Sequence, residues 1–120
     1  MAEDIIFRPL KIGKKFEAKN RIFRSSISGK FDNYDGSGSQ ARINWEESFA
    51  RGGVGAIISS FVPVHIRGRI LPNYAMIDSD DKIPFWRAVG EAVHRHDCKF
   101  LVQLIDSLLN TCDFTFFSRL

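Results

Sequence analysis

The stretch that decides the fold is Phe49-Ala-Arg-Gly-Gly-Val-Gly-Ala-Ile-Ile58. Its first residues end a helix that Ser39 caps and that runs through about Arg51. Gly52 and Gly53 end this helix, because glycine accepts the left-handed backbone found at helix C-termini. The apolar run 54–60 follows at once and has the length of a strand buried on both faces, which is typical of a parallel sheet. A helix that leads directly into such a strand predicts an α/β protein.

The side chains of the predicted helix 39–51 fall into two groups. Ala41, Trp45 and Phe49 recur every four residues, which places them on one face. The charged side chains lie on the other side: Arg42, Glu46 and Glu47. The helix is therefore predicted to be amphipathic.

The same alternation of elements extends in both directions from this stretch. Upstream, residues 5–18 predict a small hairpin, and residues 20–28 predict a strand that leads into a Ser- and Gly-rich loop. Downstream, a loop over 61–79 precedes a helix that Asp80 or Asp81 opens and that ends near Asp97, and a short buried strand follows at 99–104. The buried stripe of the second helix is expected to contain Ile83, Trp86, Val89 and Val93. This order indicates βα units, a parallel sheet and right-handed crossovers.

The composition is that of a soluble globular domain. Of its 120 residues, 44% are hydrophobic and 26% are charged. The net charge of +3 is too small and too scattered to predict a nucleic-acid partner. No apolar run is long enough to span a membrane, and no secretory signal is recognisable. The two cysteines lack metal-ligand spacing, so a reduced pair and a cytoplasmic location are expected.

Two polar features are candidates for binding. Ser25, Ser26, Ile27 and Ser28 follow the first strand, and loops after parallel strands line the active sites of α/β barrels. Hydroxyl groups and backbone amides there suit a planar cofactor; a polar exit from a strand is the alternative. Gln103 lies within an apolar strand, where a buried amide needs partners. It either binds the edge of a heterocycle or bonds a neighbouring loop. No Ser/His/Asp, Cys/His or metal-ligand pattern accompanies these features.

Several motifs follow one another in a recognisable order. Pro9-Leu-Lys-Ile-Gly13, Lys19-Asn-Arg-Ile22 and the stretch 49–58 are continued by Gly68-Arg69, residues 78–81, Trp86, Val93-His94 and Val102-Gln-Leu104. This ordered set resembles the N-terminal third of the Old Yellow Enzyme family, the NADH:flavin oxidoreductases, over about residues 5–104. The resemblance implies part of an FMN-containing (β/α)8 TIM barrel: its N-terminal hairpin, which plugs the base of such barrels, about three strands and two helices. It also implies hydride transfer from NAD(P)H to the flavin and from there to a small-molecule electron acceptor, such as an activated alkene.

The resemblance also implies cofactor-binding positions. The loop after the family's first barrel strand falls on Ser26, Ile27 and Ser28, with Ser25 before it, and its backbone is expected to contact the isoalloxazine. The family has a small residue after its second barrel strand, and in this sequence that position falls near Phe61, with Ser60 beside it. Gln103 matches the glutamine that bonds the pyrimidine edge of the flavin.

The resemblance ends after Leu104, where the family's His, Gly and Arg fall on Asp106, Leu108 and Leu109. Residues 1–104 are thus predicted to be the N-terminal part of the barrel and residues 105–120 a divergent tail. The family's catalytic residues and the phosphate-binding loops of such barrels come later, so no catalytic residue is assigned. We expect a fragment of an oxidoreductase that is inactive alone and binds FMN weakly or not at all. The alternative is a non-catalytic half-barrel that self-associates through open sheet edges.

Overall fold

The computed structural model describes residues 4–106 of the chain and contains a hairpin, a parallel sheet and two helices. The hairpin pairs β1 (Leu10–Ile12) with β2 (Phe16–Ala18) in antiparallel fashion. The sheet has the order β3-β4-β5, with all strands parallel. Its strands and the two helices are β3 (Phe23–Arg24), α1 (Gln40–Arg51), β4 (Ala56–Pro63), α2 (Ile83–His94) and β5 (Lys99–Ile105). The described residues therefore confirm the predicted α/β class, with a hairpin, three further strands and two helices.

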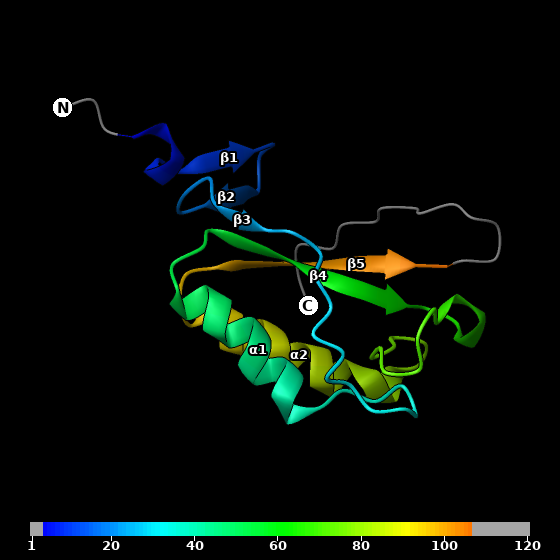
Figure 1. The fold of residues 1–120 in the computed structure, drawn as a ribbon. Coiled ribbons are helices and arrows are strands. Elements are labelled where there is room, and N and C mark those ends of the chain that lie inside the picture. Colours follow the sequence, from blue (N-terminus) through cyan, green and yellow to red (C-terminus); the bar gives the residue numbers. More distant parts are fainter. Residues whose placement is uncertain (1–3, 107–120) are drawn as a thin grey trace.

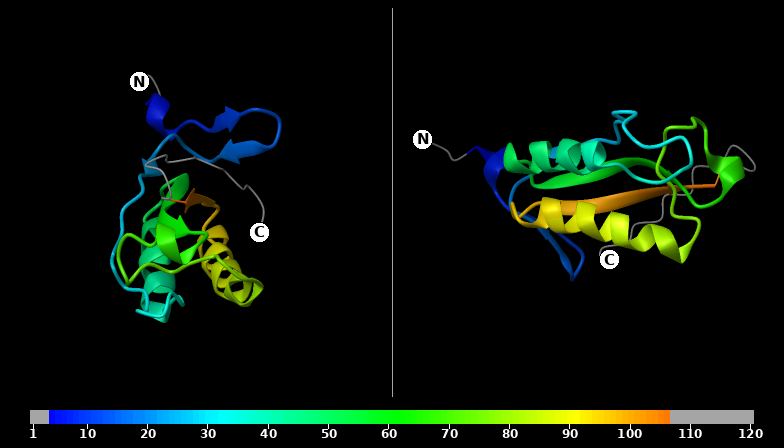
Figure 2. Two further views of the ribbon diagram at one scale, coloured as in Figure 1. Left: turned by 90° about the vertical axis from the view of Figure 1, so that its right-hand side faces the viewer. Right: turned by 90° about the horizontal axis from the view of Figure 1, so that it is seen from below.

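Both helices cover the same face of the sheet, as Figure 1 shows. The hairpin lies on the opposite side, near the N-terminal ends of β4 and β5, and the end-on view of Figure 2 shows the same arrangement. β4 is the central strand, and within residues 4–106 no further strand pairs with the outer edges of β3 and β5. The sheet thus has one covered face and two open edges in the described part of the chain.

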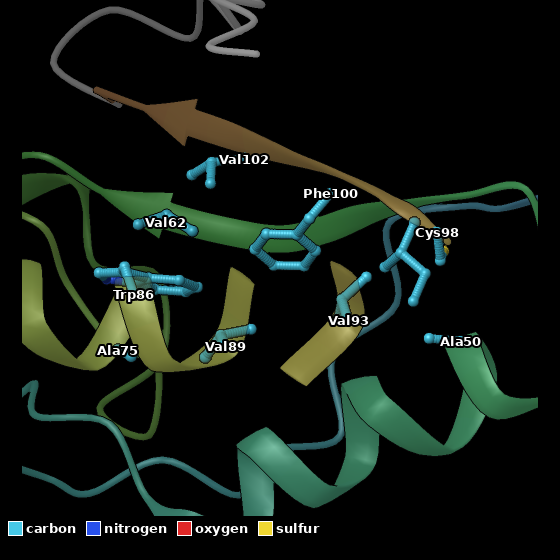
Figure 3. Close-up of a cluster of buried hydrophobic side chains, with 10 residues drawn as sticks. Ala50, Val62, Ala75, Trp86, Val89, Val93, Cys98, Phe100 and Val102 are labelled. Atoms are coloured by element: carbon cyan, nitrogen blue, oxygen red, sulfur yellow. The ribbon is translucent and has the colours of Figure 1, made fainter. Parts of the chain in front are cut away.

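The hydrophobic core lies between the two helices and the sheet (Figure 3). Trp86 is fully buried, and its indole Nε1 donates a hydrogen bond to the Met76 carbonyl oxygen at 2.9 Å. Val89 and Val93 are also fully buried, which confirms most of the predicted stripe of α2, whereas Ile83 is only half-buried. Four further core residues come from the sheet: Ile57, Val62, Phe100 and Val102. Ala50 of α1 and the loop residues Ala75 and Cys98 complete the core.

Several predicted boundaries are wrong. The strand predicted at 20–28 is confined to Phe23–Arg24, because the serine-rich segment that follows leaves the sheet. β4 continues past residue 60 to Pro63, so the loop begins later than predicted. α2 begins at Ile83, after a short 3-10 turn at Asp80–Lys82. It ends at His94 and not near Asp97, whose backbone φ of 49° lies in the left-handed region.

The predicted orientation of α1 is also wrong. The residues of α1 that are fully buried are Arg42, Glu46 and Ala50, two of which were placed on the polar side. Ala41 is exposed, and Trp45 and Phe49 are half-buried, with ring centroids 4.9 Å apart. The charged side chains turn inward because partners from other segments of the chain meet them there.

The glycines of the decisive stretch join α1 to β4 and to the segment between β2 and β3. Gly53 has a φ of 100°, which confirms the predicted left-handed helix end. Gly55 lies against Asn20: a Cβ at Gly55 would be 2.5 Å from the Asn20 carbonyl oxygen. The Gly55 N–H donates to the Ile22 carbonyl oxygen at 2.8 Å, and the Asn20 side-chain amide donates to the Gly53 carbonyl oxygen at 2.8 Å.

We expect Gly55→Ala to destabilise the chain strongly, because the added methyl group collides with backbone atoms that cannot move without breaking these hydrogen bonds. Overpacking of this kind costs about 1–3 kcal/mol or more. Gly90→Ala is the matched control, since a Cβ there meets only His94 Cε1 at an ordinary 3.9 Å within α2. That substitution should stabilise the helix by about 0.5–1 kcal/mol. Urea unfolding followed by circular dichroism measures both, and equal effects of the two variants would contradict the close approach at Gly55.

Candidate functional site

The predicted site residues lie at the end of the sheet where all three strands have their C-termini. Ser25–Ser28 follow β3, while Phe61 and Gln103 are register partners near the C-terminal ends of β4 and β5. The three strands are parallel, so their C-terminal ends lie together at the same end of the sheet. β4 separates the loop from Gln103, which places them about two strand spacings, or ~10 Å, apart. That span suits a flat ring system better than a single atom.

Phe61 and Gln103 lie on the face of the sheet away from the helices. Phe100 and Val102 on β5, and Val62 on β4, belong to the core beneath the sheet (Figure 3). Because successive strand residues alternate between faces, Gln103 and Phe61 point to the opposite face. No described helix covers that face.

Ser59 holds the backbone of Gln103 in place. The register between β4 and β5 shifts between Ile58 and Phe61, as it does at a β-bulge. Within this irregularity the Ser59 hydroxyl accepts a hydrogen bond from the Gln103 N–H at 2.9 Å and donates to the Ser60 carbonyl oxygen at 2.7 Å. A side chain therefore replaces a backbone bond of the ladder next to the candidate ligand residue.

Three buried polar atoms near the C-terminal ends of the strands have no hydrogen-bond partner within the described residues. They are Nε of Arg24, the hydroxyl oxygen of Ser60 and Oε1 of Gln103, on residues that are 7%, 2% and 6% exposed. Buried polar groups are nearly always paired, and leaving one unpaired costs free energy. Among residues 4–106 no loop residue donates to Gln103 Oε1, and the binding of a heterocycle by this amide stays a prediction.

The loop after β3 presents a different surface. Ser25, Ser26 and Ile27 are exposed, and Ser28 is half-buried, with its hydroxyl accepting from the Lys30 N–H at 3.1 Å. Beneath the loop lies Arg24, which is buried and whose Nη1 donates to the Ile27 carbonyl oxygen at 3.1 Å and to that of Ser25 at 3.4 Å. The loop is thus anchored from below through its carbonyl groups.

Sequence reasoning missed the buried charges behind this loop. Arg24 pairs with Glu46, which also accepts from Arg42 Nε at 2.8 Å; Arg42 Nη1 in turn donates to Asp32 Oδ2 at 2.9 Å. Burial, with the nearby Arg42 charge, lowers the pKa of Arg24 to about 10, so Arg24 remains charged at neutral pH. Burial raises the pKa of Asp32, although Arg42 opposes this shift. The spacing of Arg42 and Glu46, four residues apart, was the available signal, but solvated helix faces share it.

Other chemistry finds no support in residues 4–106. They hold no cluster of three or more His, Cys, Asp or Glu side chains that would bind a metal ion. Cys98 is buried, and burial raises its pKa to about 11, which makes it a poor nucleophile at neutral pH. The helices of the same segment are too short and polar for any of them to cross a bilayer.

Comparison with known proteins identifies the family. The family described as NADH:flavin oxidoreductase / NADH oxidase matches residues 5–110. The chain belongs to this family. This confirms the resemblance found in the sequence, and the family implies FMN as the cofactor and NAD(P)H as the reductant.

Individual relatives show how much of such a protein the chain represents. Bilirubin reductase of Mediterraneibacter gnavus is 31% identical over 100 residues, which are 82% of this chain and 15% of that protein. NADH oxidase of Thermoanaerobacter brockii is 33% identical over 87 residues, 72% of this chain and 13% of that protein. The chain therefore spans well under a quarter of the length of these family members.

Solved structures of the family show the same fold. The Old Yellow Enzyme from Pichia sp. AKU4542 superposes with a TM-score of 0.79 at 23% identity, over 88% of this chain and 27% of that one. A variant of NCR from Zymomonas mobilis gives a TM-score of 0.76 at 25% identity, over 86% of this chain and 32% of that one. The described residues thus correspond to part of an Old Yellow Enzyme barrel.

A pair of serine variants tests how the site is held. Ser59→Ala leaves the buried Gln103 N–H without an acceptor, so we expect a loss of about 1–3 kcal/mol in the free energy of unfolding. Ser60→Ala removes a hydroxyl oxygen that has no partner and should be neutral or slightly stabilising. Urea unfolding compares the two variants, and hydrogen exchange at the Gln103 amide should quicken in Ser59→Ala alone. A greater loss in Ser60→Ala would show that the Ser59 bond does not support the strand.

Proposed function

We propose that the chain contributes the N-terminal part of the flavin site in an FMN-dependent oxidoreductase of the ene-reductase type. Hydride would pass from NAD(P)H to FMN and on to an activated alkene or a similar small-molecule acceptor. The observation that carries this proposal is the buried Oε1 of Gln103, which has no hydrogen-bond partner among residues 4–106 and lies at the C-terminal end of the sheet, where the loop 25–28 also lies. The chain belongs to the flavin oxidoreductase family, and this supports FMN as the ligand that binds at this end of the sheet.

The described residues fit one part of the cofactor. FMN, when bound, accepts a hydride and delivers it to the acceptor. The carboxamide of Gln103 would bond the pyrimidine edge of the ring, and the exposed backbone of Ser25, Ser26, Ile27 and Ser28 would contact the ring from the other side of β4. Phe61, as the register partner of Gln103, would line the space between them.

The rest of the cofactor needs structure from elsewhere. In barrels of this kind the phosphate is held by loops after the seventh and eighth strands. We infer that residues 1–104 act as the first part of the barrel, with residues 105–120 as a divergent tail, in a cytoplasmic protein. Alone, the chain should neither bind FMN tightly nor catalyse hydride transfer, because three strands do not close an eight-stranded barrel.

Flavin binding tests the proposal in two arms. Titration of the isolated chain with FMN should give no saturable quenching of flavin fluorescence at micromolar concentration. A chimera in which residues 1–105 replace the matching region of a full-length Old Yellow Enzyme should retain bound flavin, because the remaining strands and the phosphate loops are then present.

Variants of the chimera make this test specific. Gln103→Leu should weaken FMN binding roughly tenfold, the effect of one lost hydrogen bond to a buried partner. Arg87→Met, on the exposed side of α2, should not change it. A chimera that folds but retains no flavin would refute the proposed function, and tight stoichiometric binding by the isolated chain would refute the expected inactivity.

A second candidate function follows from the outer edges of β3 and β5, with which no further strand among residues 4–106 pairs. Unpaired edges are templates for association, so the chain is proposed to self-associate if it acts as an interaction module. Sedimentation velocity at several concentrations decides between the functions. A discrete folded dimer with slow hydrogen exchange in β5 supports the module, and the absence of any discrete oligomer contradicts it.

A further inference from the structure

Arg24 occupies an unusual place for an arginine. It lies on β3, is only 7% exposed, and its guanidinium carbon is 4.9 Å from the centroid of the Phe49 ring on α1. The side chain therefore points to the helix-covered face of the sheet. From there its Nη1 reaches the carbonyl oxygens of Ser25 and Ile27, and its Nη2 pairs with Glu46.

These contacts determine the direction of two peptide groups. The described chain contains no cis peptide bond, and in a planar trans peptide the C=O and the following N–H point in opposite directions. Because the carbonyl groups of Ser25 and Ile27 turn toward Arg24, the N–H groups of Ser26 and Ser28 turn away from it. They are therefore directed away from the Arg24 guanidinium, which packs on Phe49 of α1.

A chain of ion pairs keeps Arg24 in this position. Glu46 is fully buried and binds Arg24 through one carboxylate oxygen and Arg42 through the other. Arg42 also binds Asp32, which accepts a further hydrogen bond from the Ala75 N–H at 3.2 Å. The segment that follows β3 is thus fixed at its start by Arg24 and farther along by Asp32.

We infer that Arg24 is a positioning residue, which holds the loop 25–28 so that the N–H groups of Ser26 and Ser28 face the flavin ring. The inference rests on the proposed function, since it assigns a purpose to an arrangement that exists without cofactor. A guanidinium suits this task because its planar fork bonds two carbonyl groups and a carboxylate at once. A lysine in its place would keep the charge next to Glu46 without the fork.

The test separates positioning from general stability. Backbone order parameters of Ser26, Ile27 and Ser28, measured by NMR on the chain without flavin, should be near 0.85 in the wild type. They should fall below about 0.6 in Arg24→Lys and Arg24→Met. In Arg24→Lys, residues of β4 and β5 should keep their order, because the charge balance of the cluster is preserved. Arg87→Met serves as the control with an exposed arginine.

The same variants in the chimera add a second readout. Arg24→Lys should raise the Kd for FMN roughly tenfold, because binding must then also order the loop. An ordered loop and an unchanged Kd in Arg24→Lys would overturn the inference. So would a loss of order throughout the sheet in that variant, since it would show a role in global packing alone. If the wild-type chimera binds no FMN, the proposed function fails, while the order parameters still report whether Arg24 holds the loop.

Discussion

The described structure depends on four charged side chains that are buried together: Arg24, Asp32, Arg42 and Glu46. Removing such groups from water is costly, and the cost is offset only where each charge meets an opposite charge and further hydrogen bonds. Here two guanidinium groups meet two carboxylates, so the cluster is neutral overall. Aromatic rings complete the enclosure, with the Arg42 guanidinium carbon 5.6 Å from the centroid of the Trp86 ring. One cluster thereby joins β3, the segment after it, α1 and the segment before α2.

The two ends of the sheet are held by different means, and this division explains the family motifs. At the N-terminal end, Asn20 binds Gly53, Lys19 donates to the His96 carbonyl oxygen at 2.6 Å, and Gly55 packs against Asn20. These motif residues therefore support the fold. At the C-terminal end, Ser59 holds the Gln103 backbone and Arg24 holds the carbonyl groups of Ser25 and Ile27, while Gln103 Oε1 has no partner within the described residues.

Hydrophobic periodicity predicted the parts of the fold that bury apolar side chains. Most of the stripe of α2 and the cores of β4 and β5 followed from spacing, and the end of α1 followed from its glycines. The loop 25–28 and Gln103 were singled out by their polar residues, and the family resemblance added Phe61 and the expected contacts with the flavin. The buried face of α1 did not follow, because Arg42 and Glu46 have the spacing of a solvated ion pair. Their burial depends on ion pairs with Arg24 and Asp32, which lie in other segments of the chain. A local sequence pattern does not predict contacts of this kind. Likewise, the position of Ser59 within an apolar strand does not predict that its hydroxyl accepts a hydrogen bond from Gln103 on the neighbouring strand.

In the proposed function, flavin binding and closure of the barrel would use the same surface of this chain. Gln103 points to the face away from the helices, and the edges of β3 and β5 border that face. Strands added to these edges would enclose the face and exclude water from it, and exclusion of water strengthens every hydrogen bond made there. A cofactor that binds only the closed form in turn stabilises closure through mass action. Within residues 4–106 the Gln103 side-chain carbonyl has no hydrogen-bond partner, and the proposed function accounts for this atom as half of a site that the flavin ring and the remaining strands would complete.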